Sequence, residues 1–213
     1  MTDRTNKKQN NESWGKFFLD LVIIWAVVMG IFFLIFHFVL SNNTVLGPSM
    51  QPTFQNGDRL IAIRHAKIKR GEVVIVKAPD EPGTFYIKRV IGLPGEKIVS
   101  KDNQIYINGK KIAQPWLTKG RNLIDNDTEI FYSATQNFTM KSLARSSQYQ
   151  QFYTKSQLKY INKTNRIPKG TYFVMGDHRS VSKDSRLIGT IKRTNIVGVV
   201  KLRYSPLNQI KVY

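Results

Sequence analysis

The chain has 213 residues, enough for one or two domains of ordinary size, and 41% of them are hydrophobic. It contains no cysteine, which excludes disulfide bonds, thiol catalysis and thiolate metal sites. The three histidines (His37, His65 and His178) are far apart and form no cluster with Asp or Glu at ligand spacing. A catalytic zinc site is therefore not expected.

The chain is strongly basic, with 33 Lys and Arg residues against 14 Asp and Glu and a formal net charge of +19. Such a charge is typical of nucleic-acid-binding proteins, but it also suits a surface that faces anionic lipid or cell-wall polymer. The basic residues are spread over the whole soluble part and form no single block. This distribution favours a diffuse basic surface over a groove that reads nucleic acid.

Residues 21–40, LVIIWAVVMGIFFLIFHFVL, form a 20-residue run without a formally charged side chain. As a helix it is about 30 Å long, the thickness of the hydrocarbon core of a bilayer. The apolar region of a cleaved signal peptide has only about 7–15 residues, and no small-x-small cleavage site follows in SNNTVLGPSM. We therefore predict a retained membrane anchor over residues 17–40, with the lipid bilayer as a partner.

The flanks of the anchor predict its orientation. Residues 1–16 carry four basic and two acidic side chains, whereas residues 41–57 carry no charge. The positive-inside rule then places residues 1–16 in the cytoplasm, as a short tail, and everything after Ser41 outside the cell membrane. With the soluble part outside, we expect no nucleic-acid partner.

After the anchor, short runs of β-branched and aromatic residues alternate with turn residues, which predicts a mainly β domain. Asn108-Gly109 is a typical type I′ pair between two such runs and predicts a hairpin. The expected strands cover residues 59–63, 72–77, 85–91, 104–107, 110–112, 172–175 and 196–202.

Residues 114–168 differ from the rest because they are rich in polar residues and weakly periodic. We interpret them as a less regular inserted cap with a short helix near 156–161. The all-β catalytic core then comprises residues 41–113 and 169–213, preceded by the single transmembrane helix.

The first candidate segment for chemistry is GPSMQPTF, residues 47–54. Pro48 and Pro52 fix the backbone on either side of Ser49, and Gly47 permits close backbone approach. From this pattern alone, Ser49 is either a turn residue or a nucleophile in a stiff loop.

The second candidate segment is YIKRVIGLPG, residues 86–95. Strand alternation places Lys88 and Arg89 on opposite faces, so one of the two must share a face with apolar neighbours. A lysine in such surroundings has a lowered pKa and can act as a general base. The alternative is an ordinary charge on an edge strand.

The third candidate segment is GDHRSVSKDSR, residues 176–186, which is dense in donors and acceptors. It is either a solvated loop or a hydrogen-bonded scaffold that orients a neighbouring site. A Ser–His–Asp triad that uses His178 is conceivable, although nothing in the spacing favours it.

The anchor followed by GPSMQPT, GDRLI, YIKRVIGLPGE and GDHRSVSKDSRLIG, in that order, resembles the bacterial type I signal peptidase family. The similarity extends from the anchor to about residue 200 and is weak across the insertion. The single anchor and the short length resemble the Gram-positive form of the family.

The resemblance implies a serine–lysine dyad with Ser49 as nucleophile and Lys88 as general base. Ser182 matches the hydroxyl that orients the lysine amine. No metal or organic cofactor is implied. The substrates would be secreted pre-proteins with small-x-small cleavage sites, and the secretion translocon is a possible neighbour.

The resemblance also implies supporting residues around the dyad. Two ion pairs are expected (Asp184 with Arg186, and Arg89 with Asp177), and four loop residues would shape the nucleophile loop and the oxyanion hole (Gly47, Pro48, Met50 and Pro52). Gly47 stands where some members carry a serine that helps to bind the oxyanion, which leaves the Ser49 amide as the main donor. His178 and Val181 stand where Asn is common, which leaves the local hydrogen bonding open.

The expected function is therefore signal-peptide removal by a membrane-bound serine endopeptidase. One alternative is a membrane-tethered binding protein that keeps the fold without catalysis, which an intact Ser49 and Lys88 argue against. The other is a self-cleaving regulator, because LexA-like repressors share a similar serine–lysine arrangement. Those repressors carry an N-terminal DNA-binding domain, whereas this chain has a short polar segment and an anchor.

Overall fold

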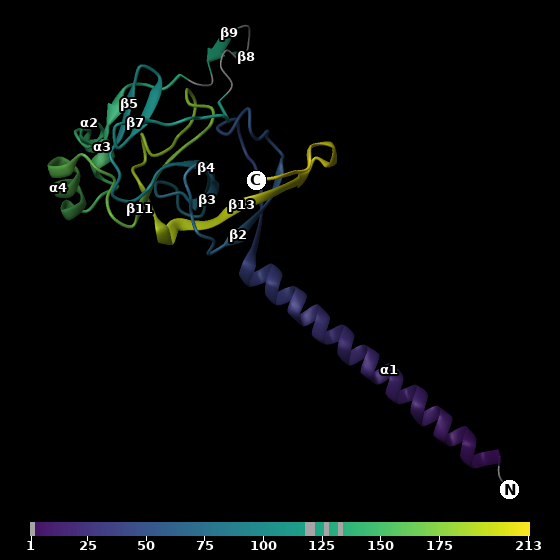
Figure 1. Ribbon diagram of the computed structural model, residues 1–213. Coiled ribbons are helices and arrows are strands. Elements are labelled where there is room, and N and C mark those ends of the chain that lie inside the picture. The colour runs from purple at the N-terminus through teal and green to yellow at the C-terminus, as the bar shows by residue number, and fades with distance from the viewer. Residues whose placement is uncertain (1–2, 118–121, 126–127, 132–133) are drawn as a thin grey trace. The chain divides into compact units, whose positions relative to one another are not determined.

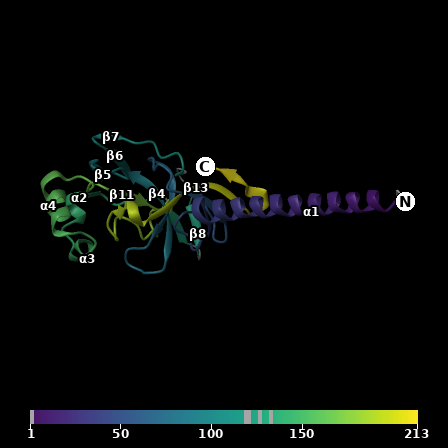
Figure 2. The same cartoon turned by 90° about the horizontal axis from the view of Figure 1, so that it is seen from below.

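The structure is a computed structural model that describes residues 3–117, 122–125, 128–131 and 134–213. It divides into two compact units, Met1–Leu40 and Ser41–Tyr213. The first is helical, and the second contains the β-sheets and the short helices (Figures 1 and 2).

The first unit consists of helix α1 (Asp3–Leu34), which continues as the π-helical segment η1 (Ile35–Val39). The 26 residues Trp14–Val39 are long and apolar enough to cross a membrane. Their large apolar side chains are exposed, as expected of a helix whose surroundings are lipid. The apolar N-terminal helix predicted from the sequence is therefore confirmed.

The main sheet of the second unit has eight strands in the order β1-β2-β13-β3-β4-β11-β12, with β14 paired to β13. Its strands are β1 (Leu40–Thr44), β2 (Arg59–Arg64), β3 (Val73–Lys77), β4 (Phe85–Gly92), β11 (Thr171–Met175), β12 (Ile191–Lys192), β13 (Ile196–Ser205) and β14 (Lys211–Val212). The prediction of a mainly β chain is confirmed.

Strand β4 lies inside this sheet, antiparallel to β3 on one side and to β11 on the other. In this register Lys88 lies opposite Val74, and Arg89 lies opposite Val73 and Met175. The edge-strand interpretation of Lys88 is therefore wrong. Because both faces of β4 are covered, Lys88 and Arg89 are both buried, at 3% and 6% exposed.

A second sheet has four strands, β10 (Phe138–Thr139), β5 (Ile98–Lys101), β6 (Gln104–Ile107) and β7 (Lys110–Lys111), in the order β10-β5-β6-β7. Asn108 and Gly109 connect β6 to β7 with φ angles of 50° and 84°, as the predicted type I′ turn requires. Strands β8 (Asn122–Asp125) and β9 (Thr128–Phe131) form a separate two-stranded sheet.

Three short helices follow the second sheet: α2 (Met140–Leu143), α3 (Ser147–Gln150) and α4 (Lys155–Thr164). Helix α4 includes the predicted helical segment 156–161. It begins with a capping box between Thr154 and Gln157 and ends at Asn165, which adopts the left-handed conformation. Two 3₁₀ segments, η2 (Arg193–Asn195) and η3 (Leu207–Gln209), flank β13.

One of the core clusters lies directly beneath the GPSMQPTF segment. Met50 and Phe54 are 1% and 0% exposed and pack with Leu60, Ile75 and Val200 from three strands of the main sheet. Burying an apolar side chain of this size contributes roughly 1.5–3 kcal/mol. These two residues therefore anchor the loop that carries Ser49 to the sheet.

Candidate active site

The loop of residues 47–54 carries the candidate nucleophile Ser49 and is called the nucleophile loop below. Its conformation is fixed by its own backbone hydrogen bonds as well as by the core. The amide of Gln51 donates to the Pro48 carbonyl at 2.9 Å, and that of Phe54 donates to the Met50 carbonyl at 3.0 Å. Gly47 has a φ of +78°, which a residue with a side chain rarely adopts, and its amide donates to Asn56 Oδ1 at 3.0 Å. The loop therefore presents Ser49 from a well-defined turn.

Lys88 reaches Ser49 from strand β4. Its Nζ donates to Ser49 Oγ at 2.9 Å and to the Ile87 carbonyl at 3.1 Å. Burial lowers the pKa of Lys88 to about 8, although the carboxylates of Asp184 and Asp177 oppose this shift. The amine is thus close to a hydroxyl, and a larger fraction of it is neutral near pH 7, as a general base requires.

Ser49 is also held by the third candidate segment. The amide of His178 donates to the Ser49 carbonyl at 3.1 Å. A Cβ added at Gly176 would lie 2.4 Å from the same carbonyl oxygen and 2.2 Å from Ser182 Oγ. The two segments are therefore in close contact, and only glycine fits between them.

Asp184 and Arg186 form a bidentate ion pair. Arg186 donates from Nε to Asp184 Oδ1 and from an Nη to Oδ2, both at 2.8 Å. Asp184 is fully buried and also accepts from the Gly176 amide at 2.9 Å. This pair fixes the backbone that contacts Ser49, and such bidentate, charge-assisted bonds are among the strongest in proteins.

Arg89 and Asp177 form a second buried ion pair on the other face of β4. Two guanidinium nitrogens of Arg89 donate to the Asp177 carboxylate, at 2.8 and 2.5 Å. Thr53, from the nucleophile loop, donates to the same carboxylate at 2.5 Å, and Arg89 lies 4.5 Å from the Trp116 ring centroid. The pair thus connects the nucleophile loop to β4.

Ser182 lies next to the dyad, but the bonds of Lys88 go to Ser49 and Ile87. The Ser182 hydroxyl is buried and has no hydrogen-bond partner among the described residues. The bond between Ser182 and Lys88 that the resemblance implies is not formed in this structure and stays a prediction.

His178, the candidate for a triad, is buried against the same loop. Burial lowers the pKa of its imidazole, and a hydrogen bond to the Pro48 backbone opposes this shift. The side chain that bonds to the Ser49 hydroxyl is Lys88. Among the described residues, no three His, Asp or Glu side chains are grouped so that they could hold a metal ion.

The sequence model of the family described as signal peptidase, peptidase S26, matches residues 18–205. The chain belongs to this family. Signal peptidase IB of Staphylococcus aureus is 34% identical over 197 residues, which are 91% of this chain and 92% of the relative. Signal peptidase I T of Bacillus subtilis (strain 168) is 34% identical over 99% of this chain and 94% of its own length.

A solved structure of a signal peptidase I from Enterococcus faecalis V583 is 29% identical and superposes with a TM-score of 0.45, covering 63% of this chain and 97% of that chain. Three of the segments that resemble the peptidase family in sequence, residues 47–54, 86–95 and 176–186, meet in space around Ser49.

The sequence did not single out three residues of this family member that contact the site. Thr53 and Trp116 both touch the Arg89–Asp177 pair, and the ring of Tyr86 lies 5.2 Å from Lys88 Nζ. Tyr86 could have been found, because it precedes Lys88 by two positions and shares its strand face. Trp116 lies in the weakly periodic insertion, where no pattern predicted a contact.

Proposed function

We propose that this chain is a membrane-anchored serine endopeptidase that removes signal peptides from exported pre-proteins, with Ser49 as nucleophile and Lys88 as general base. The observation that carries the proposal is the 2.9 Å contact between the buried Lys88 Nζ and Ser49 Oγ. Membership of the signal peptidase family supports the same activity.

The lowered pKa of Lys88 makes it an effective base. With a pKa of about 8, roughly a tenth of the Lys88 side chains are neutral at pH 7, against roughly one in 3,000 at the ordinary value near 10.5. Desolvation thus raises the population of the reactive form by roughly 300-fold.

In the first step, neutral Lys88 accepts the Ser49 proton while the Ser49 oxygen attacks the substrate carbonyl. The oxyanion is bound by the Ser49 amide, which makes no hydrogen bond within the described part of the chain. The Lys88 ammonium then protonates the departing amine and leaves an acyl-enzyme. Neutral Lys88 next activates a water molecule, which hydrolyses the ester and releases the signal peptide.

The signal-peptide side of the substrate would bind in a groove of about 510 Å³. This groove is lined by Asn42, Asn43, Thr44, Leu46, Ile75, Gly83, Thr84, Phe85 and Ile87. An extended peptide could add as a strand between residues 45–48 and 85–87. Small residues at alternate positions would suit the shallow space there, in agreement with small-x-small sites.

The supporting residues keep the dyad in place in this proposal. The Asp184–Arg186 pair fixes Gly176, and the Arg89–Asp177 pair fixes the end of the nucleophile loop through Thr53. Ser182 would rotate its free hydroxyl toward Lys88 and orient the neutral amine. The four loop residues Gly47, Pro48, Met50 and Pro52 shape the turn that presents Ser49.

The proposed topology has residues 1–16 in the cytoplasm, the apolar helix in the bilayer and the β domain outside the cell membrane. The charge difference between the flanks of the anchor supports it. The cleavage site of a pre-protein would emerge close to the anchored enzyme, beside the secretion translocon. Protease added outside intact spheroplasts should digest the β domain, and protection of that domain would contradict the topology.

Cleavage assays on purified Ser49→Ala and Lys88→Ala variants test the dyad. Each substitution should lower the kcat for a pre-protein by about 10³-fold or more, because each removes a group that acts in the transition state. Lys97→Ala is the matched control, since Lys97 is exposed and directly precedes β5 of the second sheet. Wild-type rates in both dyad variants would refute the assignment.

The same assay separates the two alternative functions. If the chain is a binding protein without catalysis, even the wild-type chain will leave the pre-protein intact. A self-cleaving regulator would cut its own chain but not the pre-protein.

A further inference from the structure

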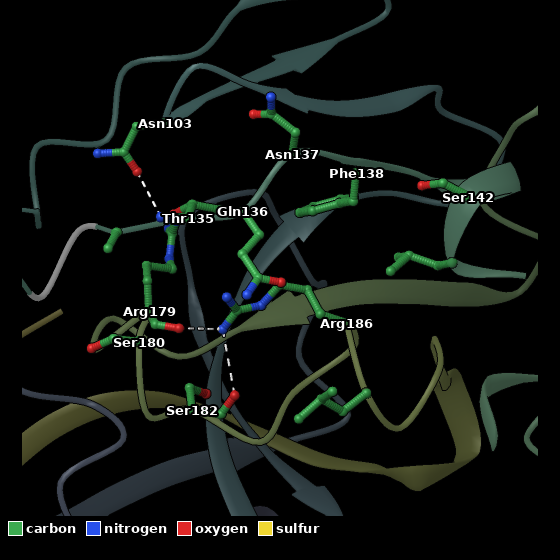
Figure 3. Close-up of a pocket in the computed structure, with 13 residues that line it drawn as sticks. Asn103, Thr135, Gln136, Asn137, Phe138, Ser142, Arg179, Ser180, Ser182 and Arg186 are labelled. Carbon is green, nitrogen blue, oxygen red and sulfur yellow. Dashed lines mark hydrogen bonds between the residues drawn. The ribbon is translucent and has the colours of Figure 1, made fainter. Parts of the chain in front are cut away.

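A pocket of about 760 Å³ is lined by Ser182, Arg179 and Arg186 among others (Figure 3). One wall comes from residues 179–187, and the other comes from residues 134–143 of the insertion. Ser182 belongs to this wall and also contacts Gly176, which in turn contacts the Ser49 carbonyl. The pocket therefore begins next to the nucleophile loop.

Arg179 lines this pocket and is 1% exposed. Its guanidinium donates to the Gly176 carbonyl at 3.0 Å, to Gln114 Oε1 at 2.6 Å and to Thr135 Oγ1 at 3.4 Å. These acceptors are all neutral, and no carboxylate forms an ion pair with Arg179 in the described part of the chain. The carboxylates of Asp177 and Asp184 attract this cation, but each is already paired, with Arg89 and Arg186 respectively. A buried cation without an ion pair of its own is costly to keep, so it points to a ligand that supplies one.

The other buried arginines of this domain show the contrast. Arg89 pairs with Asp177, and Arg203 pairs with Asp58. Burial lowers the pKa of Arg179 to about 10, so its guanidinium is still charged near neutral pH. Arg89, Arg179 and Arg186 thus share the two carboxylates of Asp177 and Asp184, which leaves one positive charge in excess in this cluster.

The rest of the lining makes the pocket suitable for an anion. Arg186 adds a second guanidinium, which is paired with Asp184 and also donates to the Arg179 carbonyl at 2.7 Å (Figure 3). The other polar side chains that face the pocket are amides and hydroxyls, and its lining contains no Asp or Glu. Arginine binds carboxylates in a bidentate geometry, which favours a carboxylate as the ligand.

We propose that this pocket binds an acidic side chain of the pre-protein, on the mature side of the cleaved bond.

The proposal rests on the proposed function, because it assumes that the signal peptide binds in the groove at residues 42–46 and 83–87. The pocket and that groove share no lining residue. A chain that enters through the groove and passes Ser49 would continue toward Ser182, and an extended chain advances about 3.3 Å per residue. Glu or Asp within the first few mature residues would then reach Arg179.

Three pre-proteins that differ at one early mature position (Glu, Gln or Lys, scanned over positions two to four) test this with the full-length enzyme in detergent. At one position kcat/KM should fall in the order Glu, Gln, Lys, with about tenfold between Glu and Lys. Arg179→Gln should bring the Glu-to-Gln ratio to about one, and Arg179→Lys should keep part of it. Equal rates for all three substrates with the wild-type enzyme would overturn the proposal.

Two controls complete the experiment. Lys159→Gln removes an exposed positive charge on α4 and should leave the ratio unchanged, which separates the pocket from the diffuse field of a chain with net charge +19. If Arg179→Gln shows no cooperative unfolding, Gln136→Glu takes its place. Gln136 is exposed and lines the pocket, so the new carboxylate should occupy Arg179 and lower the Glu-to-Gln ratio to one or below.

A ratio that persists in Gln136→Glu, or in a folded Arg179→Gln, would contradict the proposal. Failure of the proposed function would look different, because then no substrate would be cut or Ser49→Ala would cut all three. The ratio therefore reports on the pocket, and the Ser49-dependent rate reports on the catalytic dyad.

Discussion

Lys88 is a buried cation, and in the proposed mechanism its burial serves catalysis at the expense of stability. Only the Ser49 hydroxyl and the Ile87 carbonyl accept from its amine in the described structure. The attraction of Asp184 and Asp177 offsets the desolvation only in part, since the pKa still falls to about 8. The native state therefore binds fewer protons at this group than the unfolded state between about pH 8 and pH 10.5.

This difference predicts that Lys88→Met stabilises the folded domain near neutral pH. Below pH 8 Lys88 is protonated in both states, so the whole cost of burying the cation is present, and its removal should add about 1–3 kcal/mol to the free energy of unfolding. The gain should shrink as the pH rises through 8 to 10.5, where the native lysine becomes neutral. Urea unfolding of both proteins at pH 7 and pH 10.5 measures it.

The matched control is Lys97→Met, at an exposed position where no cation is desolvated. It should change the free energy of unfolding by less than about 0.5 kcal/mol at either pH. A Lys88→Met variant that is less stable than the wild type at pH 7 would mean that the lysine contributes net stability, contrary to its lowered pKa.

For single residues, the sequence predicted which side chains form the candidate site better than it predicted the partners and the burial of those side chains. Alternation required Lys88 or Arg89 to lie among apolar side chains but could not say which one. Both are buried, because β4 is covered on both faces. The cost of burying the charge is offset at Arg89 by an ion pair with Asp177, whereas at Lys88 it lowers the pKa. Neither partner can be found from local pattern, since Asp177 is 88 positions from Arg89.

Among the structural elements, the contact between the nucleophile loop and the segment 176–186 decides the geometry of the site. Gly176 lies between Ser182 and the Ser49 carbonyl, with no room for a Cβ. The motif contains this glycine, but only the packing shows why a side chain is excluded there.

Gly176→Ala should therefore lower kcat while the protein stays folded. The new methyl would displace the Ser49 backbone carbonyl and weaken its bond to the His178 amide, and a shift of about 1 Å at a reacting group can lower the rate by about 100-fold. Pre-protein cleavage and circular dichroism on the same preparation measure both properties.

Gly92→Ala is the control, because its Cβ would meet the end of the flexible Ile167 side chain and lie 3.2 Å from Phe173 Cβ, so it crowds a core cluster and not Ser49 or Ser182. It should keep most of the activity. A Gly176→Ala enzyme as active as Gly92→Ala would show that the contact is not needed to position Ser49.

Elements with a clear period were predictable, and elements defined by long-range pairing were not. The runs that became β2, β3, β4, β11 and β13 are rich in β-branched and aromatic residues, and Asn108-Gly109 predicts the turn between β6 and β7. The position of β13 between β2 and β3 depends on pairing across more than 120 residues, which no local signal reports. Strands as short as β10 and β12 have two residues each and show no period.

For the whole molecule, the anchor and the net charge of +19 have to be interpreted together. Charge alone suggests nucleic acid, whereas an apolar helix beside a basic domain suggests a protein that works at an anionic membrane surface. Family membership agrees with the second interpretation. The pocket beside Ser182 could not be predicted, because it forms between residues 179–187 and the weakly periodic insertion.

The most direct test of the account is the pH dependence of kcat/KM for a pre-protein, from pH 5 to pH 10. If Lys88 is the base, the rate should rise with pH as the amine loses its proton, with an apparent pKa of about 8. If kcat/KM instead rises with an apparent pKa below the ordinary histidine value of about 6.5 and is then constant through pH 8, His178 is indicated as the base. That result would contradict the serine–lysine dyad.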